Sequence, residues 1–259
     1  MFGSLKTEGL RKLGSKLELK DCLIIHLKRS LERNPQIKKL KKDLPYRTKV
    51  VEAVDGSKSN SDFSKSYIPR LLRPRYPFSL RSAEVACFQS HRKCWQEILD
   101  RGLEAALIIE DDVDIIDVEF TSAEDLAMKE IQMGDLVRFP IKPREKPINT
   151  TVKRDNISIF EPTLVGLGTQ AQIVTYDAAS QLLEKTEHFD RPIDVYLQLR
   201  WEHGVRILTL WPNGVREYSS SLGGSLIGKE RKNSDKLRRE LLRPLYRARL
   251  KIYARIKKN

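Results

Sequence analysis

Three adjacent carboxylates, Glu110-Asp111-Asp112, directly follow a short apolar run, and a fourth acid comes two residues later at Asp114. Adjacent acids repel one another and lose hydration when buried, so the group needs a compensating charge. A divalent cation held by oxygen ligands supplies such a charge. The pattern predicts a metal site here, with Asp112-Val113-Asp114 as a competing frame of the same motif. A solvated acidic turn is the alternative.

The segments before the acids are expected to position them. Residues 105–109 are continuously apolar, which predicts a strand buried on both faces. Open α/β sheets bind their ligands beyond the carboxyl ends of such strands, where these acids would lie. Residues 82–99 carry a broad apolar stripe typical of a helix, with Ser82 as the expected N-cap. Glu84, Ser90 and His91 lie on that helix.

The start of the chain predicts a strand, a loop and a helix, an opening typical of nucleotide-binding proteins. The strand covers residues 22–27, and Ser30 is expected to cap a helix that ends near residue 40. Leu27, Arg29 and Arg33 follow the strand, where an arginine can hold a phosphate or a base. A solvated helix face is the competing interpretation.

Strands and helices alternate through most of the chain, which predicts an α/β fold with a largely parallel sheet. A second strand at residues 47–53 ends in an Asp55-Gly56 turn, and residues 57–80 form a long loop of the kind that often binds ligands. Further strands are expected at residues 136–139, 157–160, 171–175 and 205–210. Further helices are expected at residues 122–133 and 177–187 and from Pro192.

Most of the net positive charge lies in the last 31 residues. The chain carries a net charge of +13, and residues 229–259 hold 13 Lys/Arg against 3 Asp/Glu. Their apolar residues recur at helical steps, and Pro244 predicts a kink or two consecutive helices. A basic amphipathic helix of this type suits an anionic membrane surface. A helix packed on the body and a nucleic-acid contact are alternatives, and the wide apolar stripe disfavours nucleic acid.

Cysteine usage indicates a reducing compartment, and hydropathy indicates a chain without a membrane span. Cys22, Cys87 and Cys94 have neither metal-ligand spacing nor the density of a secreted disulfide scaffold. No segment approaches the roughly 18 apolar residues of a membrane span, and the first 20 residues lack a signal-peptide core. The expected location is therefore cytoplasmic, soluble or peripheral to a membrane.

Several motifs together resemble one known family. His26 to Arg33, Glu52 to Gly56, Ser82 to His91 with Trp95, and Ile108 to Asp112 resemble, in order and spacing, glycosyltransferase family 25. Gly168-Thr169-Gln170-Ala171 and Pro192-Ile193-Asp194 are similar to its later motifs, so that the resemblance spans about residues 22 to 225. The family contains bacterial lipopolysaccharide and lipooligosaccharide glycosyltransferases, with collagen galactosyltransferases as relatives.

Three departures from the family's motifs leave the donor sugar open. The family more often has Asn-Leu-Asp-Arg where this chain has His26-Leu27-Lys28-Arg29. It more often has Leu-Ser-His in place of Gln89-Ser90-His91, and Ala-Tyr in place of Ala171-Gln172.

The resemblance implies a GT-A domain over residues 1–228, followed by the basic tail at residues 229–259. It implies an inverting transfer from a UDP-sugar, most often UDP-galactose, to a lipopolysaccharide or lipooligosaccharide glycan at the cytoplasmic face of the inner membrane. Mn²⁺ or Mg²⁺ would stabilise the diphosphate leaving group. Asp112 is the first choice of metal ligand, with Glu110 or Asp111 contacting metal or ribose and Asp114 serving the competing frame.

Inversion also needs a general base that takes the proton of the acceptor hydroxyl. Asp194 is the candidate, because Pro192 fixes its approach at a helix start, although a carboxylate stabilised by the helix dipole would look the same. Asp55 after the second strand contacts uracil or ribose, or only forms the turn. The expected donor-binding residues are Leu27, Arg29, Arg33, Asp55, Gly56, Glu84, Ser90, His91, Glu110 and Asp111.

Two other classes of function fit the same residues. The acids also suit a metal-dependent nucleotidyl or phosphoryl transferase whose basic tail binds nucleic acid. A peripheral membrane protein without enzymatic activity, in which the acidic turn is inert, is the third interpretation.

Overall fold

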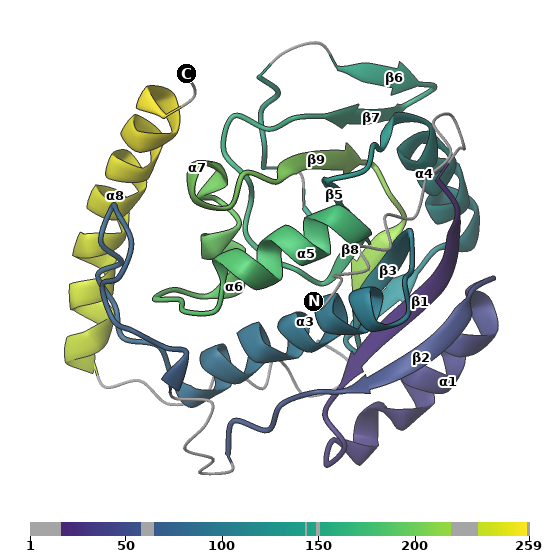
Figure 1. Cartoon of the computed structure of the whole chain (residues 1–259), viewed down its shortest axis with the longest axis horizontal. Coiled ribbons are helices and arrows are strands. Elements are labelled where there is room, and N and C mark those ends of the chain that lie inside the picture. Colours follow the sequence, from purple (N-terminus) through teal and green to yellow (C-terminus); the bar gives the residue numbers. More distant parts are fainter. Residues whose placement is uncertain (1–16, 58–64, 143, 149–150, 219–232, 258–259) are drawn as a thin grey trace, which may run out of the picture.

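The structure, a computed structural model, describes residues 17–57, 65–142, 144–148, 151–218 and 233–257. An eight-stranded sheet runs through its centre in the order β2-β1-β3-β8-β5-β9-β7-β6 (Figure 1). Six strands point in one direction, and only β7 and β8 run against them. The bounds are Leu19–His26 (β1), Arg47–Glu52 (β2), Ala105–Glu110 (β3), Asp135–Arg138 (β5), Val152–Arg154 (β6), Ile157–Phe160 (β7), Ala171–Thr175 (β8) and Arg206–Trp211 (β9).

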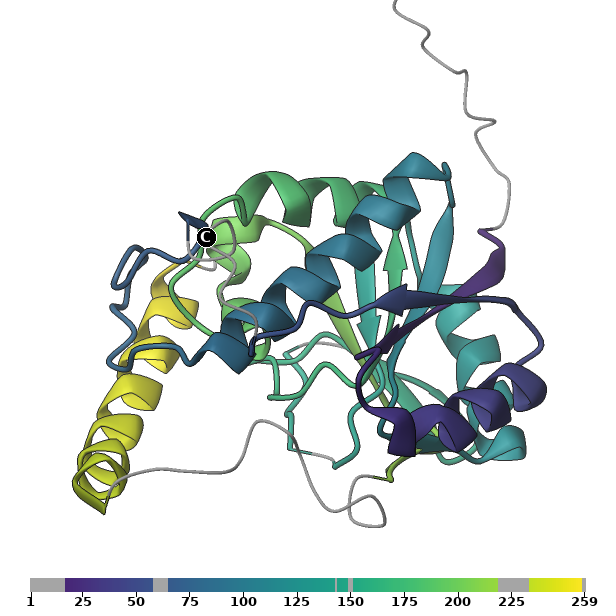
Figure 2. The ribbon, with the colours of Figure 1, turned by 90° about the horizontal axis from the view of Figure 1, so that it is seen from below.

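Helices cover both faces of the sheet (Figure 2). Helices α3 (Ser82–Asp100) and α5 (Tyr176–Lys185) pack on one face, and α1 (Asn34–Asp43) and α4 (Asp117–Glu130) pack on the other. Alternate residues of β3 point into the two cores, Ala106 and Ile108 into one and Leu107 and Ile109 into the other. The continuous apolar run of β3 is therefore explained by burial on both faces, and the predicted α/β fold with a mostly parallel sheet is confirmed.

Two predicted helix caps are wrong. Ser82 is the first residue of α3, and the cap is Arg81, whose backbone N–H donates to the Glu84 carboxylate at 2.8 Å. Ser30 makes no side-chain cap, because a single 3₁₀ turn, η1 (Leu31–Arg33), comes before α1 begins at Asn34. Glu84 is therefore the third residue of α3, and its carboxylate satisfies the backbone N–H of the capping residue.

The chain between β3 and α4 differs from the prediction. Helix α4 begins at Asp117, five residues before the expected start, with Asp117 and Glu119 in its first turn, where the helix dipole favours acids. Ahead of it lies the short strand β4 (Val113–Ile115), which pairs antiparallel with β10 (Val215–Glu217). Three-residue strands are too short to show a periodicity, which is why the sequence did not reveal them.

The tail forms one helix, α8 (Asn233–Ile256), which stands beside the body of the molecule (Figure 1). Of the two expected outcomes, a division into two consecutive helices is not observed, because Pro244 lies inside one continuous helix. Pro244 and Glu240 are exposed, so water can solvate the carbonyl that loses its helical donor. The predicted start of the tail at residue 229 lies outside the described residues.

A buried arginine ties α8 to the body. Arg191 is fully buried, pairs with Asp190, donates to the hydroxyl of Tyr246 on α8 at 2.8 Å, and bonds to the carbonyls of Leu72 and Pro74. Tyr246 also makes an edge contact with Tyr76, with ring centroids 5.4 Å apart. A charged, fully satisfied hydrogen-bond network therefore fixes one face of the helix.

Replacing Tyr246 by Phe tests this attachment. The change leaves a donor of the buried Arg191 guanidinium without a partner, which we expect to lower the free energy of unfolding by about 1–3 kcal/mol. Leu245→Ala, one residue away on the exposed side of α8, is the control and should change it by less than about 0.5 kcal/mol. Urea denaturation gives both values, and equal effects would show that Arg191 does not fix the helix.

Candidate functional site

The three adjacent acids lie at the carboxyl end of β3, in the turn that leads into β4. Their backbone is held from two sides. The N–H of Glu110 donates to the carbonyl of Gln170 at 2.8 Å, and the N–H of Tyr218 donates to the carbonyl of Asp112 at 2.8 Å. The three side chains meet different surroundings, so each acid is compensated differently.

Asp111 is compensated by the protein itself. Its carboxylate is buried, accepts a hydrogen bond from Arg33 at one oxygen, and lies 2.6 Å from Nδ1 of His26 at the other. Both oxygens therefore have partners within the chain. Sequence reasoning did not find this pairing, because His26 is separated from Asp111 by 85 residues and parallel β1 and β3 bring them together.

Glu110 is held by α3 and by the loop before β8. Its Oε1 accepts a hydrogen bond from the Thr169 hydroxyl at 2.8 Å and lies 3.3 Å from Nε2 of His91. Burial opposes ionisation of Glu110, but the bonds from His91 and Thr169 outweigh it, so that the pKa of Glu110 is lowered. Glu110 is therefore a carboxylate at neutral pH.

Cys87, His91 and Glu110 form a second group with metal-ligand chemistry, in which the ligand atoms lie within 4.8 Å of one another. Both ring nitrogens of His91 already have neighbours, Glu110 on one side and the Gln172 amide at 3.1 Å on the other. Burial raises the pKa of Cys87 well above its usual value, so this residue is a neutral thiol. The group is thus bonded internally, and Asp112 is the better metal ligand.

Asp112 is the acid without compensation. Among the described residues, its Oδ1 is buried and has no hydrogen-bond partner, and the nearest cationic atom, Nη1 of Arg33, lies 3.8 Å from Oδ2. Burial first, and repulsion from Glu110 second, raise the pKa of Asp112 to about 7. An unpartnered, partly desolvated carboxylate oxygen beside an ionised glutamate is a suitable donor set for a hard divalent cation such as Mn²⁺ or Mg²⁺.

Asp114 is not part of this group. It lies on β4, its Oδ1 is 2.5 Å from Nζ of Lys39, and it is absent from the lining of both cavities described below. Burial opposes ionisation of Asp114, but the hydrogen bond and charge of Lys39, together with the bonds from Ile115 and Gln36, lower the pKa of Asp114. The structure therefore separates the two acids of the Asp112-Val113-Asp114 frame.

A smaller cavity of about 170 Å³ brings together most of the expected donor-binding residues. The loop at Asp55-Gly56 forms one side and is held by two contacts. The Ser90 hydroxyl accepts from the N–H of Val54 at 2.9 Å, and Asp55 pairs with Arg29 at 3.0 Å. The predicted residues in its lining are Leu27, Arg29, Arg33, Gly56, Ser90, His91, Glu110, Asp111 and Asp112.

Gly56 owes its identity to close packing. A Cβ atom at this position would lie 2.7 Å from the carbonyl oxygen of Ser82, at the start of α3. Only glycine allows the loop to approach the helix this closely. Two predicted donor residues are not in the lining of the smaller cavity: Asp55 pairs with Arg29, and Glu84 caps α3 and lines a larger neighbouring cavity.

The larger cavity has a volume of about 1120 Å³ and shares Glu110 and Asp112 with the smaller one. Asp194 also lines it, at the start of the short helix α6 (Ile193–Tyr196). Its carboxylate accepts from the N–H of Val195 at 2.8 Å and from the N–H of Gly168 at 3.1 Å. Burial outweighs these bonds and raises the pKa of Asp194, so that this carboxylate is a stronger base than an ordinary one.

Two further features of this cavity were not predicted. Buried Arg138 pairs with Glu145 and donates to the carbonyls of Leu167 and Gly168, which fixes the loop that bonds Asp194 and Glu110. A row of basic residues on α8 also lines the cavity. Their regular spacing in the sequence was visible, but it was assigned to a membrane-facing surface.

The fold and the site define an α/β protein with a carboxylate-lined cavity at the carboxyl end of a strand in a mostly parallel sheet. The chain belongs to glycosyltransferase family 25. Its sequence matches the family described as "Glycosyltransferase family 25 (LPS biosynthesis protein)" over residues 20–197. The predicted family is thereby confirmed.

Individual relatives include proteins named as galactosyltransferases and proteins named as inactive. The chain is 37% identical over 106 residues to procollagen galactosyltransferase 2 of Mus musculus, covering 39% of this chain and 17% of that protein. It is 34% identical over 234 residues to the probable inactive glycosyltransferase 25 family member 3 of Rattus norvegicus, covering 85% of this chain and 40% of the relative. The matches thus span less than half the length of these relatives. A solved structure of A197 from STIV has a TM-score of 0.35 and 12% identity, with 83% of this chain and 99% of that chain covered.

Asp112→Asn tests whether the site trades stability for ligand binding. The pKa of Asp112 in the folded protein, about 7, lies above its value in the unfolded chain. Ionisation of this carboxylate therefore lowers the free energy of unfolding progressively as the pH rises from about 4 to 7, and the loss is complete above pH 7. In the presence of a chelator at pH 8, we expect the variant to be more stable than the wild type by about 2–4 kcal/mol. At pH 4 the difference should vanish. Denaturant unfolding at both pH values measures it, and a destabilised variant at pH 8 would contradict the assignment.

Proposed function

We propose that the protein is an inverting, metal-dependent glycosyltransferase that moves galactose from UDP-galactose onto a lipopolysaccharide or lipooligosaccharide glycan. The single observation that supports this most strongly is the unpartnered oxygen of Asp112, at the junction of two cavities. Membership of the family and the galactosyltransferase names of relatives support the choice of reaction and sugar.

The donor nucleotide is assigned to the smaller cavity, with its diphosphate toward Asp112. The lining there offers Arg29 and Arg33 as cations and the backbone of the Asp55-Gly56 loop as polar contacts. Mn²⁺ or Mg²⁺ would be held by Asp112 with Glu110, and the ion supplies positive charge for the departing diphosphate. Asp111 positions Arg33 and contributes no free oxygen, because both of its oxygens have partners.

Asp194 is assigned as the general base. Its burial in the larger cavity raises its pKa, which improves proton acceptance from an acceptor hydroxyl, while the N–H groups of Gly168 and Val195 fix its orientation. Arg138 holds Gly168 in place through its carbonyl and is therefore a positioning residue for the base.

Three substitutions separate these roles. Asp112→Ala should abolish the stimulation of UDP-sugar hydrolysis by Mn²⁺, because the unpartnered ligand is lost. Asp194→Asn should lower transfer to the acceptor by about 10²- to 10⁴-fold while UDP binding persists. Asp114→Asn is the matched control and should leave both activities within about twofold, because Asp114 pairs with Lys39 outside the cavities.

A panel of nucleotide-sugars assayed by product release provides the measurements. Loss of Mn²⁺ stimulation in Asp114→Asn with retention in Asp112→Ala would reverse the assignment of the metal ligand. Normal acceptor transfer by Asp194→Asn would remove Asp194 as the base.

We further propose that α8 holds the protein at an anionic membrane surface, at the cytoplasmic face of the inner membrane. None of the helices in the described part of the chain has the length and apolar character needed to cross a membrane. The outer side of α8 exposes large apolar side chains that recur along one helical stripe, namely Leu241 at 65%, Leu245 at 59%, Ile252 at 53% and Ile256 at 67%. Exposed Arg249 lies beside this stripe, a pattern suited to anionic headgroups.

The double substitution Leu245→Ser with Ile252→Ser tests the membrane surface. It removes two apolar side chains from the stripe and should weaken sedimentation with phosphatidylglycerol-containing vesicles by about 100-fold. Both residues are exposed, so the thermal unfolding temperature should stay unchanged. Unaltered sedimentation would disprove this surface. The double variant is a cleaner test than removal of residues 229–259, which would also remove Tyr246 and Leu250 from the core.

A further inference from the structure

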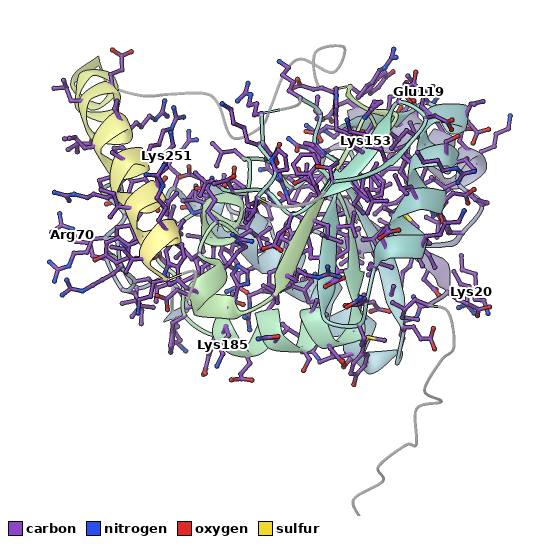
Figure 3. The ribbon with its side chains drawn as sticks, turned by 90° about the horizontal axis from the view of Figure 1, so that it is seen from above. Lys20, Arg70, Glu119, Lys153, Lys185 and Lys251 are labelled. Atoms are coloured by element: carbon purple, nitrogen blue, oxygen red, sulfur yellow. The ribbon has the colours of Figure 1, made fainter. Side chains whose placement is uncertain are left out.

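One row of cations on α8 faces the larger cavity. Arg243, Arg247, Lys251 and Arg255 recur every four residues, which places them along one side of the helix, and all four line the cavity. Lys251 lies on the side of α8 that is turned toward the body of the molecule (Figure 3). The row is distinct from the exposed apolar stripe and belongs to the site.

These four cations have no internal compensation. Among the described residues, none of them forms an ion pair with an acid, whereas nearby Arg200 pairs with Glu161 and buried Arg191 pairs with Asp190. Like charges four residues apart on a helix repel one another. An uncompensated row that borders a cavity therefore attracts an anion.

The charges in the cavity are separated by element. The lining acids come from the end of β3, from α3, from the start of α6 and from β10, while the basic row comes from α8; the acids are Glu110, Asp112, Glu84, Asp194 and Glu217. Arg144 and Lys146 add positive charge from the loop after β5. One part of the cavity thus suits a cation and a proton acceptor, and the other suits a negatively charged group.

The row is held in a defined position. Tyr246, between Arg243 and Arg247, receives the hydrogen bond from buried Arg191, and Leu250, next to Lys251, is buried against the body. Tyr253 contacts Trp201, with ring centroids 6.3 Å apart. A fixed helix face can discriminate between ligands, because its cations need little ordering on binding.

We propose that this row binds an anionic group, a phosphate or a carboxylate, on the acceptor glycan. The inference rests on the proposed glycosyl transfer, and it specifies the acceptor as an acidic sugar. The donor's diphosphate is assigned to the smaller cavity, beside Arg29 and Arg33, which do not line the larger one. The row accordingly serves the acceptor.

The test compares three sugars that differ in charge. Glucose, glucose 6-phosphate and glucuronate are titrated into the full chain in the presence of UDP and Mg²⁺, with binding followed by saturation-transfer NMR. The two charged sugars should bind about tenfold more tightly than glucose, as two added ionic contacts in water allow. Their relative affinities decide between phosphate and carboxylate. Equal affinities for all three sugars would overturn the proposal.

Two double variants on the same helix provide the matched comparison. Arg247→Glu with Lys251→Glu reverses charge in the row, and Arg249→Glu with Lys257→Glu makes the same change in net charge outside the cavity. The first should remove the preference for charged sugars, and the second should keep it. If both double variants lose the preference for charged sugars, net charge alone explains that preference and the proposal is overturned.

The donor site is measured separately. If the first double variant loses affinity for UDP but retains it for glucose 6-phosphate, the row binds the donor diphosphate and the proposal is wrong. Failure of the wild type to hydrolyse any UDP-sugar would count against the proposed reaction alone, because the sugar titrations do not depend on turnover.

Discussion

The structure depends on how three adjacent carboxylates are accommodated at the end of one buried strand. The apolar core on both sides of β3 fixes the strand, so the acids that follow cannot move apart into solvent. Asp111 is neutralised by His26 and Arg33, and Glu110 is held by His91 and Thr169. Compensation stops at Asp112, whose Oδ1 has no partner among the described residues. The protein thus compensates two acids itself and leaves an oxygen of the third without a partner among the described residues.

These compensating groups come from segments that are distant in the chain and close in the sheet. His26 ends β1, His91 lies on α3, and Thr169 precedes β8, and each of β1 and β8 pairs directly with β3. The same loop at residues 166–170 also donates to Asp194 through Gly168. The proposed metal ligand and the proposed base are therefore linked through one loop, which Arg138 anchors by its bonds to Leu167 and Gly168. A change at Arg138 would affect both groups at once.

The sequence predicted the fold, and it singled out most of the residues that the structure gathers around the smaller cavity, because both depend on local signals. The strands at residues 157–160 and 171–175 have the expected bounds, and eight of the ten expected donor residues line the smaller cavity together with Asp112. The sequence could not distinguish the roles of Asp112 and Asp114, because the two acids differ in their surroundings in the folded protein. Asp114 lies on β4 and pairs with Lys39. The internal pairing of Asp111 was equally hidden, because it depends on which strands are neighbours. Long-range pairing is a property of topology, and spacing along the chain does not encode it.

The sequence also could not show which side of helix α8 faces the body, and this orientation bears on the proposed function. Its amphipathic pattern was visible, but a helix of this composition has apolar residues on two sides, and the pattern does not say which side meets the body. Tyr246 and Leu250 are buried, so that Leu241, Leu245 and Ile252 remain outside and the basic row is turned into the cavity. If the outer stripe rests on an anionic membrane, as proposed, the same helix places a cationic cavity wall next to that surface. An acceptor carried by a lipid would then reach the site along α8, and its acidic groups would be neutralised where its hydroxyl must approach Asp194.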